Sequence, residues 1–222
     1  MPPIPAIPIH HRLDISDFSS VSNDGTLLPL QAIYIGKTDK SCLPASSPCY
    51  KEALAAGFHF EYSGTATYWS NQQTMHSFVN NILAPYFNQV KAKAGCPPSQ
   101  MTMWQIDVWS IHCSQEFHHW MKAYHPTIIL DYVPSGCTGV VQPCNIGIQW
   151  PFKLSTKRSY HEDIMNKFLH QIQKGEPVLI DDRLAIHHNR SICWLWNAYQ
   201  DVNKKELVKR VSFLPLLILN RH

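Results

Sequence analysis

The chain has 222 residues, enough for one globular domain with a hydrophobic core and too few for two domains of ordinary size. Hydrophobic residues make up 45% of the sequence and charged residues 16%, a balance that excludes an intrinsically disordered chain. The formal net charge of +3 permits a nucleic-acid partner without requiring one, and no apolar run approaches the ~20 residues of a membrane span.

The seven cysteines are an odd set, without CxxC spacing, and no signal peptide precedes them. Disulfides are rare in the cytosol and the nucleus, where thiols are kept reduced. We therefore expect reduced thiols.

Residues 1–12 open the chain with a proline-rich segment, whose four prolines lie within residues 2–8. Proline lacks a backbone N–H and has a fixed φ angle, so the segment predicts a disordered leader rather than a helix or a central strand. A folded domain is expected over 13–212, followed by an atypical apolar tail over 213–222.

The first part of the domain is predicted to be β-sheet. Imperfect alternation marks a strand over 13–21, and the turn from Asn23 to Gly25 leads into a second strand over 27–36. A third strand is expected over 58–63, after a loop. These segments predict two or three antiparallel strands.

The clearest helix is predicted from Ser70 to about Gly95. Ser70 and Gln73 have the spacing of a capping box, and apolar residues then recur at helical intervals. Gly95 and the prolines behind it end the helix, and Pro85 inside it predicts a kink or a break.

A strand, a helix and another strand follow, which together predict a parallel crossover unit. The strands are expected over 101–109 and 127–134, and the helix begins near Ser114. Further helices are expected over 148–173, 191–202 and 204–213. This order predicts the α/β class, specifically a ribonuclease-H-like mixed sheet flanked by helices.

Asp107 is the acid best placed for chemistry, because it lies where the crossover strand stops and faces the crevice beyond the sheet. A turn or helix-capping aspartate explains the same position equally well. His112 follows in the next loop, where it can hold a carboxylate or a phosphate. Asp131 shares a strand face with Ile129, which favours packing over metal binding.

Six blocks occur in order along the chain: LPLQAIYIGKT, FEYSGTATYWSNQQTM, NILAPYF, IDVWSIHCSQEFHHWM, TIILDYVPSGCTGVVQPCNIGIQWPFK and KRSYHEDI. Together they resemble the DDE superfamily endonucleases, the catalytic domains of pogo- and mariner-type transposases, in the version abundant in fungal genomes. The similarity extends from about Val21 to Arg210.

The resemblance implies a nuclease in which three carboxylates hold two divalent ions that act on DNA phosphodiesters. Mg²⁺ or Mn²⁺ is the implied cofactor, since such sites are rich in oxygen. The second acid falls on Asp107, which is the implied metal ligand. The third falls on Asn145, in a block where Gln142, Pro143 and Gly147 follow the pattern.

The first acid belongs to a strand some way before the turn at Asn23, and no block of its type occurs in the chain. Asp14, Asp17 and Asp24 do not match its position. The first strand of the sheet is therefore expected to be missing. With Asn145 at the third position, the resemblance predicts a degenerate site that does not hold the metal tightly.

DNA is the implied partner, because the helices after the third acid lie beside DNA in this family. Lys153, Lys157 and Arg158 are the candidate phosphate contacts, although a solvated helix face explains them as well. We expect a nuclear or cytoplasmic protein without a membrane partner, and the sequence leaves the oligomeric state open.

Three functional alternatives remain open. An incomplete gene model would make the protein an active metal-dependent DNA endonuclease or transposase. If the domain was retained without its cleavage activity, it would be a non-catalytic module that binds DNA or another protein. If the sequence comes from a decaying transposable element, its product would be barely folded, because loss of a central strand exposes a sheet edge.

Overall fold

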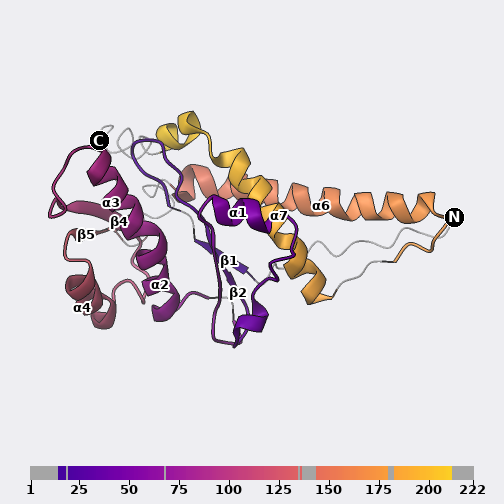
Figure 1. Cartoon of the computed structure of the whole chain (residues 1–222), viewed down its shortest axis with the longest axis horizontal. Helices are drawn as coiled ribbons and strands as arrows, with labels where there is room; N and C mark the ends of the chain where they lie inside the picture. The colour runs from indigo at the N-terminus through magenta and orange to yellow at the C-terminus, as the bar shows by residue number, and fades with distance from the viewer. Residues whose placement is uncertain are drawn as a thin grey trace.

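The computed structural model describes residues 15–18, 20–67, 69–134, 136, 144–179 and 183–211 (Figure 1). The predicted leader and apolar tail lie outside these ranges. The elements run β1 Ile15–Phe18, β2 Gln31–Tyr34, η1 Asp39–Ser41, α1 Tyr50–Ala55, β3 His59–Tyr62, α2 Gln72–Phe78, η2 Val79–Leu83, α3 Ala84–Lys93, β4 Thr102–Ile106, α4 Gln115–Tyr124, β5 Ile128–Tyr132, η3 Cys144–Ile148, α6 Gln149–Gln173 and α7 Leu184–Val202. Residues 205–211 are also helical. Among these helices, none has the length and apolar composition needed to cross a membrane.

The described strands form two small sheets, one of three strands and one of two. β1 pairs antiparallel with β2, β2 pairs parallel with β3, and β4 pairs parallel with β5. Mixed pairing with helices around it confirms the predicted α/β class and is consistent with a ribonuclease-H-like fold. The predicted crossover unit is confirmed as β4–α4–β5.

The direction of β3 corrects the expected antiparallel arrangement. The short helix α1, which was not predicted, lies between β2 and β3 and begins at the end of the loop predicted over 43–50. A hairpin reverses the direction of the chain, whereas a crossover helix brings it back parallel to the first strand. With only six residues, α1 is too short to show helical periodicity.

The long helix predicted around Pro85 forms, with a π-helical turn inside it. Its capping box consists of Asn71 and Thr74, not of Ser70 and Gln73. The Asn71 side chain accepts the N–H of Thr74, and the Thr74 hydroxyl accepts the N–H of Asn71. The π turn η2 ends two residues before Pro85, whose missing N–H removes one hydrogen bond of an α-helical ladder. The predicted interruption is confirmed.

Two hydrophobic clusters hold the elements together. The first joins β2 and α1 to the start of α6, to α7 and to residues 205–211, and buries Tyr34 and Phe152. The second packs β4 and β5 against α2, η2 and α4, and buries Phe78 and Phe117. Figure 1 shows the same division, with α2, α3, α4, β4 and β5 grouped at one end of the molecule.

Helices α6 and α7 form a hairpin joined by polar contacts. Asp163 on α6 forms an ion pair with Arg190 on α7, and its second oxygen accepts the indole N–H of Trp194 at 3.1 Å. α7 begins at Leu184, seven residues before the predicted start. Its first turns have little apolar periodicity of their own, and contacts such as the one at Arg190 stabilise them against α6.

Gly147 in η3 lies against Val211, and a Cβ at this position would come within 2.3 Å of the Val211 Cγ2 atom. Val211 is buried and has a stiff branched side chain, so it cannot move away cheaply. Replacing Gly147 by Ala should lower the free energy of unfolding by about 1–2 kcal/mol, measured by urea denaturation. In a Val211→Ala background the same change should be neutral or stabilising; an equal loss in both backgrounds would contradict this packing.

Candidate active site

Asp107 directly follows β4, at the carboxyl end of the strand, as predicted. The neighbouring strand β5 ends beside it, because Ile106 lies opposite Tyr132 in the register. The Asp107 side chain is 39% exposed. An acid this accessible can meet a ligand at the edge of the sheet.

The His112 ring lies against Asp107. Its Nδ1 atom is 2.8 Å from Asp107 Oδ1 and 3.2 Å from the Asp107 carbonyl oxygen. An ionised carboxylate can only accept, so the Nδ1–H group donates. The ring is buried among Trp104, Trp109 and Phe117. This packing fixes the imidazole and thereby orients the carboxylate.

Hydrogen bonds from β5 hold the loop that carries His112. The Tyr132 hydroxyl donates to the His112 carbonyl oxygen at 2.6 Å and lies 2.7 Å from His118 Nε2. Burial raises the pKa of Tyr132 to about 12, so the hydroxyl keeps its proton at neutral pH. The end of β5 therefore supports the loop that follows β4.

The hydrogen bond from His112 lowers the pKa of Asp107 below its ordinary value. A depressed folded-state pKa means that the carboxylate stabilises the fold above its unfolded pKa of about 4, and that this stability is lost as the pH falls through the lowered value. Asp107→Asn should therefore be less stable than wild type at pH 7, by less than about 1 kcal/mol because the group is partly exposed. Urea denaturation from pH 7 to pH 3 should show this gap closing; a gap that widens in acid would contradict the assignment.

Asn145, the predicted position of the third acid, lies in the π-helical turn η3 immediately before α6. Its side chain lies outside the described part of the structure, as do Gln142 and Pro143. η3 packs into the first cluster through Ile148, whereas β4, the strand that Asp107 follows, packs into the second. The two predicted positions thus come from elements with separate cores.

Lys153, Lys157 and Arg158 are all exposed on α6. Their spacing places Lys153 and Lys157 on one face and turns Arg158 about 100° away from Lys157. Trp150 is 70% exposed and lies on the same face, one turn before Lys153. The structure thus groups two of the three predicted basic residues with an aromatic ring that sequence analysis did not single out. The spacing of Trp150, Lys153 and Lys157 at i, i+3 and i+7 was the available signal.

The other acids near the two sheets have local roles where they are described. Asp131 accepts from Gln105 Nε2 at 3.0 Å across the β4–β5 pair. Asp24 accepts the N–H of Thr26 at 2.9 Å inside the predicted turn. Both observations favour structural functions for these carboxylates.

A further polar cluster, on β3 and α2, was not predicted. His59 Nε2 lies 2.7 Å from Glu61 Oε1 and 3.0 Å from Ser77 Oγ, while Gln31 Nε2 donates to the other Glu61 oxygen at 3.0 Å. His59 and Glu61 share a strand face, a spacing visible in the sequence, but Ser77 reaches them only through folding. The contacts join β3 to α2.

A sequence model of the family described as DDE superfamily endonuclease matches residues 18–210. The chain belongs to the DDE superfamily endonucleases. The family resemblance in the sequence is thereby confirmed, while the pogo- and mariner-type assignment within it stays a prediction. No curated protein and no solved structure matches the chain.

DDE endonucleases generally use divalent metal ions, so the donors around Asp107 can be compared with that requirement. Within the described ranges, no group of three or more His, Cys, Asp and Glu side chains is placed to hold a metal ion. A two-ion site needs several carboxylates, because two dications close together repel each other strongly. The pair Asp107 and His112 does not by itself fit a two-metal centre.

Proposed function

We propose that the chain is a transposase-derived DDE endonuclease domain of the pogo and mariner type that binds DNA and has lost two-metal cleavage. The support comes from the site at Asp107. The buried His112 orients the acid at the family's second position, whereas the third position carries Asn145. A DNA partner makes the nucleus the proposed site of action.

The exchange of Asp for Asn at position 145 matters because it removes a full charge. At ~4 Å and an effective dielectric constant of ~20, two unit charges interact by about 4 kcal/mol, and a unit charge with a dication by about twice that before desolvation. Losing even half of this energy would lower the metal affinity or the reaction rate by several powers of ten, at ~1.4 kcal/mol per factor of ten. We therefore propose that the loss of one carboxylate disables metal binding.

The proposed DNA surface is the α6 face that carries Trp150, Lys153 and Lys157. Exposed lysines bind phosphates without reading sequence. An exposed indole beside them adds a ring on which bases can stack. This combination favours nucleic acid over a protein partner.

Fluorescence anisotropy with a labelled DNA duplex over a salt series tests the proposal. Wild type should bind with an affinity that falls as salt rises. Lys153→Ala/Lys157→Ala should weaken binding about tenfold or more and reduce the slope of log K against log salt by about 2, because two phosphate contacts are lost.

Lys51→Ala/Lys122→Ala is the matched control, since it removes the same charge from exposed positions on α1 and α4. This variant should keep the wild-type slope. Binding that does not depend on salt would rule out the DNA surface. If both double variants weakened binding equally, the effect would come from the net charge of the protein and not from the α6 face.

Nicking of supercoiled plasmid in Mg²⁺ or Mn²⁺ tests the loss of cleavage. Wild type and Asn145→Asp should both leave the plasmid intact, because one restored acid does not rebuild the three-carboxylate site. Calorimetry should detect no tight binding of either ion.

An active endonuclease is the second candidate, favoured by the preserved hydrogen bond between Asp107 and His112. Nicking by the wild-type chain that disappears in Asp107→Asn would establish this alternative in place of the degenerate site. Nicking that persists in Asp107→Asn would point to a contaminating nuclease.

A further inference from the structure

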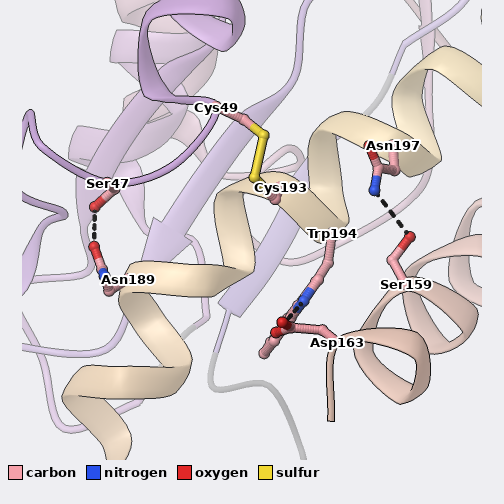
Figure 2. The surroundings of a disulfide bond; sticks show 8 residues. All are labelled: Ser47, Cys49, Ser159, Asp163, Asn189, Cys193, Trp194 and Asn197. Carbon is pink, nitrogen blue, oxygen red and sulfur yellow. Dashed lines mark hydrogen bonds between the residues drawn. A yellow bond between two sulfur atoms is a disulfide. The ribbon is translucent and has the colours of Figure 1, made fainter. Parts of the chain in front are cut away.

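Cys49 and Cys193 are joined by a disulfide, which corrects the expectation that these thiols are reduced (Figure 2). Their Cα atoms are 5.2 Å apart, within the range that a disulfide spans. Cys49 directly precedes α1, and Cys193 lies in the middle of α7. The bond therefore links the start of α1 to the middle of α7, and the two cysteines are 144 positions apart in the sequence.

The surroundings of the disulfide keep the two cysteines together even without the bond. The Ser47 hydroxyl donates to the Asn189 side-chain oxygen at 2.5 Å, one turn of α7 away from Cys193. The buried Tyr34 hydroxyl lies 3.0 Å from Ser191 Oγ. These contacts hold α7 against β2 and the segment before α1, so the reduced thiols would stay close enough to react again.

The backbone of Cys49 has an unusual conformation that the surrounding structure must stabilise. Its φ angle of 60° lies in the left-handed region, and Cys49 is the single residue other than glycine with a positive φ angle in the described part of the chain. An L-amino acid in this conformation costs about 1–2 kcal/mol relative to the right-handed helical region. The surrounding structure has to hold the residue there, and the bond to Cys193 is one such restraint.

Hydrogen bonds connect α7 in turn to α6. Figure 2 shows Asn197 donating to Ser159 and the Trp194 indole donating to Asp163, both residues of α6. The disulfide thus anchors the whole α6–α7 hairpin, including the face with Lys153 and Lys157, to α1 and its sheet. Both cysteines are half-buried, and we expect small thiols to reach them.

We propose that Cys49 and Cys193 form a reversible, redox-sensitive clamp between α1 and the α6–α7 hairpin. Closure is an exchange with a small-molecule disulfide such as oxidised glutathione. One protein thiolate attacks the glutathione disulfide and releases one glutathione thiol; the second then attacks the mixed disulfide and releases the other. Two protein thiols are oxidised and one glutathione disulfide is reduced. Excess reduced glutathione reverses both steps.

The 222-residue chain is incubated in glutathione buffers of varied ratio, and acid quenching, alkylation and peptide mapping then test the clamp. Cys49 and Cys193 should lose alkylation together as the buffer becomes more oxidising, and should regain it together when the folded protein is returned to reduced glutathione. Reduction should lower the Tm by roughly 5–15 °C, because it removes a link that closes a long loop. Amide exchange in α7 should become faster in the reduced protein.

Two double variants separate the clamp from general thiol effects. Cys96→Ser/Cys113→Ser, at cysteines that carry no disulfide, should keep the full difference in Tm between the two buffers. Cys49→Ser/Cys193→Ser should lose it. A difference that persists in Cys49→Ser/Cys193→Ser overturns the proposal.

Alkylation of the wild-type protein tests whether the Cys49–Cys193 bond forms and reopens, even if a variant does not fold. Thiols that stay open in excess oxidised glutathione contradict the clamp. A bond that stays closed in the folded protein under excess reduced glutathione contradicts its reversibility.

Discussion

Replacing Trp194 by Ala is expected to lower the free energy of unfolding by about 3–5 kcal/mol. Trp194 is 2% exposed, and its ring packs edge-on against Tyr160 with the centroids 5.1 Å apart. The substitution leaves a cavity between α6 and α7 and removes the hydrogen bond to Asp163. Urea or thermal denaturation measures the loss.

Trp150→Ala is the matched control for this prediction. The same residue type is removed from the same hairpin, but the Trp150 side chain is 70% exposed, so the change should stay within about 0.5 kcal/mol. Similar losses for the two variants would show that the α6–α7 packing is not as described.

Replacing His112 by Ala should lower the free energy of unfolding by about 2–4 kcal/mol, because a ring that is 1% exposed leaves a cavity between Trp104 and Phe117. It also removes the donor that lowers the pKa of Asp107. The pKa of Asp107 should therefore rise toward its ordinary value, which carboxyl NMR titration measures.

His119→Ala provides the comparison for His112. His119 is exposed on α4 and should be replaceable within about 0.5 kcal/mol, without a change in the pKa of Asp107. An unchanged Asp107 titration in His112→Ala would contradict the orienting role proposed for the imidazole, even if stability falls.

The residues that support the proposed function lie on different elements. Around Asp107, a strand end, a buried imidazole and a Tyr132 hydroxyl fix one carboxylate. On α6, exposed positive charge lies beside an exposed indole. The first arrangement suits orientation of a ligand group and the second suits phosphate contact, so loss of one need not abolish the other.

Much of the fold could be predicted, because neighbouring residues encode it. The apolar run before Asp107 predicted β4, and the spacing of Phe117 and Met121 predicted α4. The interruption at Pro85 followed from the missing N–H of proline. In each case the signal lies within a few positions of the feature.

The direction of β3 and the start of α7 could not be predicted in the same way. The helix α1 that makes β3 parallel has only six residues, and the first turns of α7 depend on contacts with α6 such as the ion pair of Arg190 with Asp163. A helix of six residues is too short to show periodicity, and contacts between residues distant in the sequence are not encoded in local periodicity.

The candidate site likewise combines features that the sequence predicts with features that only the folded chain shows. The sequence alone determined the family and the position of Asp107 at a strand end, and it predicted Asn145 as the third-acid position and the basic residues of α6 as phosphate contacts. Only the tertiary structure decided that the His112 ring is buried and donates to Asp107, that Trp150 is exposed beside Lys153 and Lys157, and that Cys49 meets Cys193. The physical reason is that residue type and local spacing are written along the chain, whereas burial and contacts across 144 positions exist only once the chain has folded.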